Sequence, residues 1–132
     1  MKYLIFILIL FSCSNDESPE IETITVNGKY WMKENVSGYY SWDDAASVCP
    51  NGFRLPSKDE YLTMISLGNN VIYQKLGYQD SDGTTWLKGQ YGYYWTSTPQ
   101  NAGSWAFVFN DSDMFVSGYD RSKKMCVRCV KK

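Results

Sequence analysis

The chain contains no histidine among its 132 residues. This absence excludes every site built on an imidazole, including the most frequent general base of enzymes and the commonest ligand of zinc. Cysteine and proline are also scarce, with four of each. Acid–base chemistry would therefore fall to carboxylates, lysines or tyrosines, and the sequence predicts neither a metal site nor a cofactor.

A strong excess of one charge is missing as well. The chain has 13 basic and 14 acidic residues. Cleavage of a leader that contains Lys2 would leave 12 basic and 14 acidic residues. The one basic cluster runs from Arg121 to Lys132 and alternates with apolar residues as a strand would. Because nucleic-acid binders carry a positive footprint, we expect no nucleic-acid partner.

No apolar run is long enough to span a membrane, but a short one stands near the N-terminus. Leu4–Phe11 is apolar throughout and follows Lys2, and it is far shorter than the ~20 residues of a transmembrane helix. Ser12 and Cys13 close this run and resemble the lipobox of bacterial lipoproteins, whose cysteine is acylated. A plain signal peptide with an incidental cysteine is the alternative. We expect residues 1–12 to be a lipoprotein signal peptide and Cys13 to be lipidated.

Residues 13–22 are predicted to be the lipidated cysteine and a flexible acidic tether, because they hold four carboxylates, Pro19 and little that is apolar. Two or three acyl chains anchor a protein stably, since each buried methylene contributes about 0.8 kcal/mol. Acidic residues after such a cysteine also resemble a surface-export signal of some outer-membrane lipoproteins, although a spacer would look similar. The expected location is the cell envelope, as a surface-exposed outer membrane lipoprotein.

Three cysteines remain after Cys13, and an oxidising envelope favours a disulfide. A bridge between Cys126 and Cys129 is disfavoured if both lie on one strand, because residues three apart point to opposite faces. Cys49 should therefore pair with one of these two, closing a loop of about 80 residues that contributes roughly 4.5 kcal/mol. The Cys-x-x-Cys spacing alone is a weak indication of a redox or metal site.

Hairpin and capping motifs mark the first half of residues 23–132. Asn27-Gly28 is typical of a type I′ turn between strands at 24–26 and 29–32. Ser41 predicts the start of a helix through residue 48, and Ser57 with Glu60 forms a capping box for a second helix that reaches residue 68. Residues 53–56 between the helices are expected to be a connector.

Strand patterns dominate the second half. Residues 71–76 could form a helical turn, and residues 77–92, rich in Gly, Asp and Thr, are expected to be a loop. Strands are predicted at 93–98, 105–110, 114–117 and 125–130. Helices followed by a run of strands, rather than alternating with them, predict an α+β domain with an antiparallel sheet.

Three strings of residues resemble a known bacterial family. They are Cys49-Pro50-Asn51-Gly52-Phe53-Arg54-Leu55-Pro56, Tyr94-Trp95-Thr96-Ser97-Thr98 and Val127-Arg128-Cys129-Val130. In this order they resemble the Fibrobacter succinogenes major paralogous domain, over roughly residues 29–132. That family is similar to C-type-lectin-like domains. The resemblance implies that residues 23–132 form a C-type-lectin-like domain with two helices, an antiparallel sheet and one disulfide.

The same resemblance implies which cysteines pair. In such a fold a cysteine at the end of the first helix bridges one in the last strand, and Cys49 and Cys129 occupy those places. Cys126 departs from the family pattern and is expected to be a free, buried thiol.

An enzymatic function is not expected. The adjacent carboxylates at 43/44, 59/60, 80/82 and 111/113 all have ordinary explanations in helix first turns or tight turns. The calcium motifs of sugar-binding C-type lectins, a Glu/Gln-Pro-Asn/Asp loop and a Trp-Asn-Asp strand, are absent. Asn110–Asp113 does concentrate oxygen ligands, but a hairpin turn is the commoner role for Asn, Asp and Ser in this order.

Binding is the function that remains. Lectin-like folds present ligands on their loop-rich side, where aromatic rings stack on sugar faces and charged neighbours hydrogen-bond to hydroxyls. The candidate ligand-binding residues are Trp86, Tyr91, Asp111, Asp113, Tyr119 and Arg121.

The leading hypothesis is a lipid-anchored envelope module for binding or adhesion, which recognises a glycan or a surface protein. An accessory structural subunit of an envelope assembly, with no small ligand, is the alternative. A carboxylate-based glycan hydrolase is a third hypothesis, and it would depend on Asp111 or Asp113.

Overall fold

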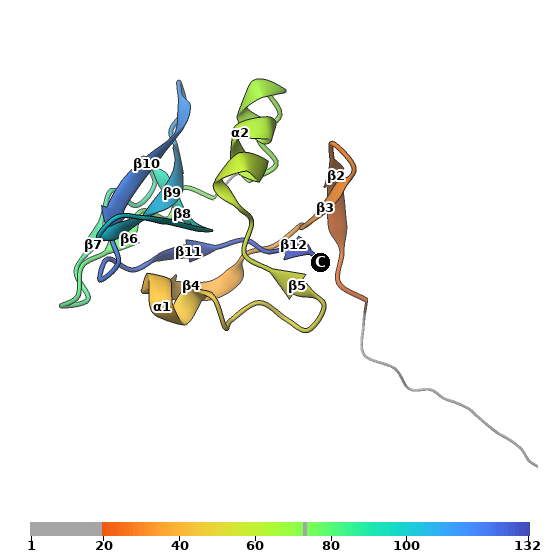
Figure 1. Cartoon of the computed structure of the whole chain (residues 1–132). Helices are drawn as coiled ribbons and strands as arrows, with labels where there is room; N and C mark the ends of the chain where they lie inside the picture. The colour runs from red at the N-terminus through yellow and green to blue at the C-terminus, as the bar shows by residue number, and fades with distance from the viewer. Residues whose placement is uncertain (1–19, 73) are drawn as a thin grey trace, which may run out of the picture.

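The computed structural model describes residues 20–72 and 74–132 (Figure 1). The predicted signal peptide, Cys13 and most of the predicted tether lie outside the described residues. None of the helices in the described part is long and apolar enough to cross a membrane. The elements are, in chain order, β2 (Thr23–Val26), β3 (Lys29–Met32), β4 (Val36–Tyr40), α1 (Trp42–Ala45), β5 (Phe53–Arg54), α2 (Lys58–Ser66), β6 (Tyr78–Gln79), β7 (Thr85–Trp86), β8 (Gly92–Gln100), β9 (Gly103–Phe109), β10 (Met114–Asp120), β11 (Met125–Val127) and β12 (Val130–Lys131).

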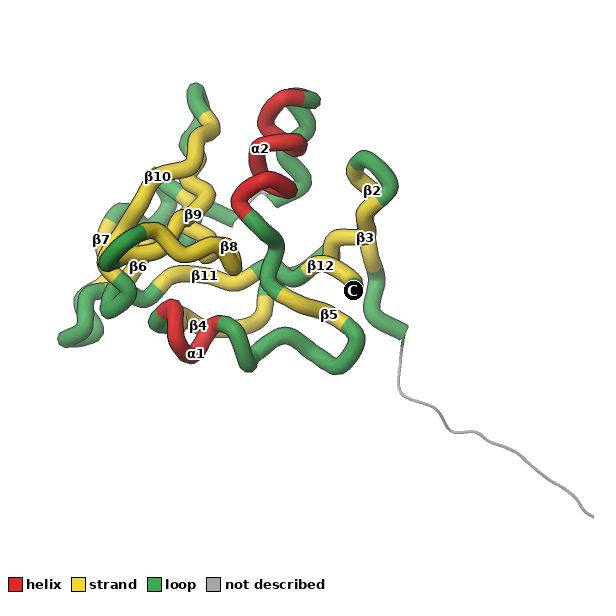
Figure 2. Tube along the Cα trace, in the orientation of Figure 1, coloured by secondary structure: helices red, strands yellow, loops and turns green. Residues whose placement is uncertain are grey.

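The expected α+β, C-type-lectin-like fold class is wrong. The described residues are 44% strand and 12% helix, and their strands form three sheets (Figure 2). Both expected helices are present, but α1 is a single turn of four residues. Strands β4, β5, β6 and β7 arise where none was expected. Two-residue strands such as β5 exist only through pairing with a distant partner, here β12, so a local sequence pattern does not reveal them.

The largest sheet has the strand order β10-β9-β8-β11-β4. Strands β8, β9 and β10 form an antiparallel meander. Strand β11 runs parallel to β8, with Cys126 opposite Tyr94, and antiparallel to β4. The sheet is therefore mixed, in contrast to the expected antiparallel one.

The second sheet has the order β2-β3-β12-β5 and contains the predicted N-terminal hairpin. Asn27 and Gly28 have φ values of 51° and 78°, as a type I′ turn requires. The single strand expected at 125–130 is divided into β11 and β12, which belong to different sheets. Between them lies Cys129, which forms a disulfide with Cys49 at a Cα–Cα distance of 5.9 Å. This is the pairing that the family resemblance implied, and Cys126 is free and buried as expected.

Two buried clusters pack against the five-stranded sheet because its side chains alternate between two faces. Tyr94, Phe107 and Cys126 belong to the cluster that α2 covers. Their neighbours Trp95 and Val108 belong to the cluster that contains the disulfide and the α1 residues Trp42 and Ala45. In Figure 1, α2 and α1 accordingly lie on opposite sides of the sheet.

Helix α2 begins with the predicted capping box, in which Ser57 and Glu60 each accept a backbone N–H of the other. Arg54 donates two hydrogen bonds of 2.8 Å to the Glu60 carboxylate. Burial by itself would raise the pKa of Glu60, but the hydrogen bonds from Arg54 and from the Ser57 backbone outweigh it and lower the pKa to about 2. The buried face of the helix places Tyr61 parallel to Phe107, with a ring separation of 4.7 Å.

Candidate functional site

An exposed tryptophan stands out in the segment that was expected to be a loop. Trp86 keeps 46% of its surface exposed, whereas Trp31 and Trp95 are fully buried. Its indole Nε1 donates a hydrogen bond of 2.6 Å to a carboxylate oxygen of Asp80. The ring is therefore held in one orientation with much of its surface open to solvent. We call residues 78–86, which contain β6 and β7, the Trp86 hairpin.

The Trp86 hairpin is tied to the segment that follows β10. The backbones of Gln79 and Lys124 exchange two hydrogen bonds of 2.8 Å. The ammonium of Lys123 lies 3.2 Å from the second carboxylate oxygen of Asp80 and 4.8 Å from the centre of the Tyr78 ring. Asp80 therefore contacts both the indole and a cation, and these contacts hold the hairpin against the segment after β10. Such preorganisation lowers the entropic cost of binding.

Gly77 lies where the chain enters the Trp86 hairpin, and it allows the backbone at this point to pass close to the backbone of Trp86. It has a φ of 69°, and a Cβ at this position would overlap the backbone carbonyl oxygen of Trp86. Its N–H donates to the carbonyl of Tyr91 at 2.8 Å. Only glycine combines this conformation with so close an approach.

A buried arginine forms hydrogen bonds to the segment just before Gly77. Arg128 has no exposed surface. Its guanidinium donates to the side chain of Gln74 at 2.7 Å and to the carbonyl of Val71 at 3.4 Å. It also donates to the side chain of Asn35 at 2.8 Å and the carbonyl of Met32 at 3.1 Å. These partners are all uncharged, and burial lowers the pKa of Arg128. The hairpin thus starts from a segment bonded to the core.

A tyrosine cluster, formed by Tyr78, Tyr91, Tyr93 and Tyr119, fills the space between the Trp86 hairpin and the sheet. The Tyr93 ring lies 5.0 Å from Tyr78, 5.9 Å from Tyr91 and 5.8 Å from Tyr119. Burial raises the pKa of Tyr93 to about 12. Because the Tyr91 and Tyr119 rings pack around this buried ring, they support the hairpin more than they offer an open face to a ligand.

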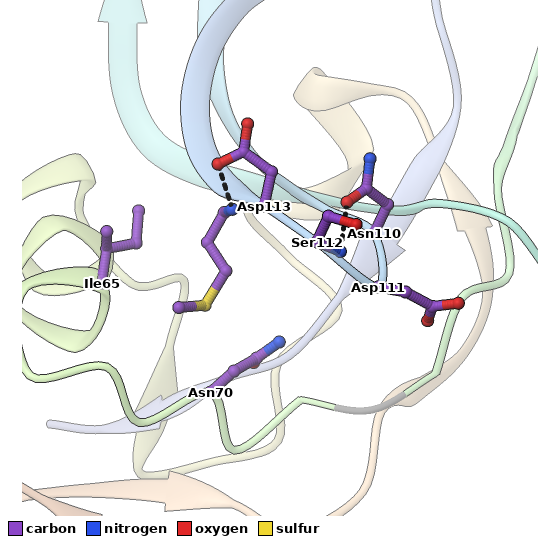
Figure 3. A pocket seen from close by; sticks show the side chains of 7 residues that line it. Ile65, Asn70, Asn110, Asp111, Ser112 and Asp113 are labelled. Carbon is purple, nitrogen blue, oxygen red and sulfur yellow. Dashed lines mark hydrogen bonds between the residues drawn. The ribbon is translucent and has the colours of Figure 1, made fainter.

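The predicted turn at 110–113 lies elsewhere, beside the end of α2. A groove of about 460 Å³ separates it from the helix and is lined by Ile65, Asn70, Asn110, Asp111, Ser112, Asp113 and Met114 (Figure 3). Asn70 points toward the turn from below, and Ile65 forms the opposite wall. We call this space the turn groove.

The oxygen atoms of the turn groove mostly serve the turn itself. Asn110 accepts the N–H of Ser112 at 2.8 Å, and Asp113 accepts the N–H of Met114 at 2.9 Å. Asp111 forms an ion pair with Lys75. Among the residues that the structure describes, no group of three or more His, Cys, Asp or Glu side chains is placed to hold a metal. The groove could accept a polar ligand, but its carboxylates do not converge on one point.

Arg121 occupies a third location. Its guanidinium lies over the Trp42 ring at 4.5 Å, and its Nε donates to the carbonyl of Gly103 at 2.9 Å and to the hydroxyl of Ser104 at 3.2 Å. These contacts hold the end of β10 against the start of β9. Arg121 therefore has a structural explanation that does not need a ligand.

The structure thus divides the six predicted site residues among four environments. Trp86 is open, Tyr91 and Tyr119 are packing residues, Asp111 and Asp113 border the turn groove, and Arg121 is held against β9. Asp80, which orients Trp86, was missed as a site residue. Its only sequence signal was its position in the oxygen-rich Asp80-Ser81-Asp82 string, because the contact with Trp86 depends on a hairpin that was expected to be a loop.

Residues 71–130 match the model of a family described as a domain of unknown function (DUF8237). The matched segment includes the Trp86 hairpin, the β8–β9–β10 meander and β11. No curated protein matches the chain.

Proposed function

We propose that this protein is a binding module of the cell envelope that recognises a glycan through the exposed face of Trp86. The observation that carries the proposal is an indole that is 46% exposed and yet fixed by its hydrogen bond to Asp80. A large apolar ring left in water costs free energy, and one held in place there is suited to stack on a partner.

The surroundings of Trp86 favour a sugar over a protein partner. Residues 81–90 are all exposed, and apart from Trp86 and Leu87 they are polar or glycine. Protein-binding hot spots usually combine several apolar anchors in a desolvated patch. A single ring with a polar rim instead matches a sugar, which has one apolar face and hydroxyls at its edge. The Asp80 carboxylate, which accepts the indole N–H, and the Lys123 ammonium beside it supply an acceptor and a donor at that rim.

The proposal includes three expectations from the sequence: lipidation at Cys13, a location at the outer membrane surface, and a relationship to the Fibrobacter succinogenes major paralogous domain family. It also includes the absence of catalysis. The accessory-subunit hypothesis predicts a stable co-purifying protein and no glycan binding, so the experiment below separates the two.

The experiment measures glycan binding by the full chain, purified in detergent, on a glycan array. Trp86→Ala should reduce binding about two-fold to ten-fold or more, since aromatic stacking contributes about 0.5–1.5 kcal/mol beyond the area that it buries. Its melting temperature should stay nearly unchanged, because the ring is exposed. Asp80→Asn should weaken binding less, since it disturbs the orientation of the ring but leaves the ring in place.

Tyr30→Ala is the matched control, because Tyr30 is an equally exposed aromatic residue, at 49%, on a different sheet. This variant should bind as the unmodified protein does. Equal losses in Trp86→Ala and Tyr30→Ala, or no binding to any glycan, would reject the proposal. Binding should persist in a calcium chelator. Loss of binding there would indicate instead a metal-dependent site at the turn groove.

A further inference from the structure

Strand β10 is an outer strand of the five-stranded sheet, and it lacks the devices that usually protect such an edge. Its seven residues pair with β9 in one continuous register without a bulge. Met114–Asp120 contains no proline and no lysine. Within residues 20–72 and 74–132, no strand pairs with its other side. Native edge strands usually carry bulges, prolines or inward charges that prevent pairing with another chain.

The hydrogen bond at the β9–β10 turn shows which backbone groups face outward. Asn110 N–H donates to the Asp113 carbonyl at 3.0 Å, so these two residues form a hydrogen-bonded pair. Hydrogen-bonded and non-hydrogen-bonded residue pairs alternate along an antiparallel ladder. The backbone groups bonded to β9 are therefore those of Phe115, Ser117 and Tyr119. The N–H and C=O groups of Met114, Val116 and Gly118 point to the open side, whereas the Asp120 carbonyl accepts the N–H of Lys123 at 3.2 Å. The Asp113 carboxylate accepts the Met114 N–H, as expected for a donor without a partner on β9.

We propose that β10 pairs antiparallel with β10 of a second copy of this chain, about a two-fold axis at Ser117. In this register Val116 and Gly118 of the second copy exchange two backbone hydrogen bonds, and the reciprocal pair does the same. Phe115, which is 36% exposed, then lies opposite Tyr119 of the second copy. This is a non-hydrogen-bonded pair, the kind in which side chains are closest, and aromatic cross-strand pairs stabilise a sheet.

The charges at the two ends of β10 select this partner and this direction. Asp113 lies in the turn before the strand and Arg121 directly follows it, whereas the nearby Asp111 and Lys123 are already paired with Lys75 and Asp80 within one chain. Antiparallel self-pairing brings Asp113 of each copy to Arg121 of the other, whereas parallel pairing would bring like charges together. In the Ser117 register, Asp113 lies opposite Arg121 of the second copy, whose bonds to β9 use only its Nε. Neither residue has an ion-pair partner within the described part of one chain.

The test is cysteine cross-linking of the full chain, expressed in a bacterial envelope and compared on non-reducing gels. Ser117→Cys places two thiols across the two-fold axis, where Cα atoms are about 4.5 Å apart, within the range for a disulfide. Ser112→Cys is the control, because residue 112 is more exposed but its two copies lie ten residue steps apart, roughly 30 Å. Ser117→Cys should give a band at twice the mass of the monomer band, and Ser112→Cys at most background.

Two further variants test the same register without a cross-link, by sedimentation of the detergent-solubilised full chain. Ser117→Lys sets two like charges opposite each other at the axis, and Val116→Pro removes an outward N–H that β9 does not use. Both should be monomeric where the unmodified chain is dimeric, with the Cys49–Cys129 disulfide intact.

A monomeric unmodified chain would overturn the proposal, as would equal cross-linking of the Ser112→Cys and Ser117→Cys variants. A cross-link from Ser117→Cys to a different envelope protein would assign the edge to a foreign strand and would also overturn self-pairing. The inference stands apart from glycan recognition, since neither outcome depends on Trp86.

Discussion

Two buried tyrosines provide the sharpest test of the packing described above. Tyr61 and Tyr94 both belong to the cluster beneath α2, and both are fully buried. The Tyr61 hydroxyl has no hydrogen-bond partner among the described residues. The Tyr94 hydroxyl accepts a hydrogen bond of 2.8 Å from Asn35 and donates one of 2.9 Å to the Gln74 carbonyl. Replacing either residue with phenylalanine removes one oxygen atom, so the chemical change is the same.

The expected effects have opposite signs. Tyr61→Phe removes a hydroxyl that lost its hydration without gaining a partner, so we expect the free energy of unfolding to rise by about 1 kcal/mol. Tyr94→Phe leaves the Asn35 amide and the Gln74 carbonyl, which belong to partly buried residues, without this partner. Its free energy of unfolding should fall by about 2–3 kcal/mol. For a domain of this size, 1 kcal/mol corresponds to about 4 °C in melting temperature.

Equilibrium urea unfolding with the disulfide intact measures both values, and equal denaturant slopes would show that the unfolded states are comparable. A Tyr61→Phe variant that is destabilised as much as Tyr94→Phe would refute the reasoning. It would mean that the Tyr61 hydroxyl is satisfied, as a buried water would do.

Three more outcomes are expected. Replacing Cys49 and Cys129 with alanine should lower the free energy of unfolding by about 4 kcal/mol, because the disulfide closes a loop with a sequence separation of 80. Calorimetry measures this loss of stability, and a loss below about 1 kcal/mol would contradict the loop-closure argument. Gly77→Ala should lower the free energy of unfolding by about 2 kcal/mol or more and weaken any glycan binding, since the new Cβ overlaps the Trp86 carbonyl. An unchanged melting curve would show that this close approach of the two backbones is not required. Glu60, whose pKa falls from 4.5 to about 2 on folding, stabilises the fold at and above pH 4.5, and this contribution, about 1–2 kcal/mol after solvent screening, disappears as the pH falls toward 2. Unfolding curves between pH 2 and 6 should show this slope, and Glu60→Gln should abolish most of it.

The sequence predicted those parts of the fold whose signals are local. The Asn27-Gly28 turn and the capping box at Ser57 and Glu60 depend on residues at most three positions apart, and both are present. Trp86 was identified as a candidate site residue, and the structure leaves it exposed.

Long-range pairing accounts for what was wrong. β5 is two residues long and exists because β12 pairs with it. β6 and β7 pair with each other in a local hairpin, and Gln79 of this hairpin also bonds to Lys124, 45 positions away. Nothing in the composition of residues 77–92 distinguishes such a hairpin from a glycine-rich loop. The fold class was therefore misjudged as α+β, because short strands were read as loops and connectors.

The sequence by itself determined the turns, the helix start at Ser57 and the absence of any histidine chemistry, because each follows from residue identity or from neighbours along the chain. The tertiary structure alone decided that Arg128 is buried among uncharged partners, that Asp80 orients Trp86, and that β10 is left at an open edge. The Arg128 contacts join residues at least 54 positions apart, and the Asp80–Trp86 contact, although it spans six positions, depends on a hairpin that is bonded to Lys124. The energies of these features depend on burial and on distances that exist only after the chain has folded.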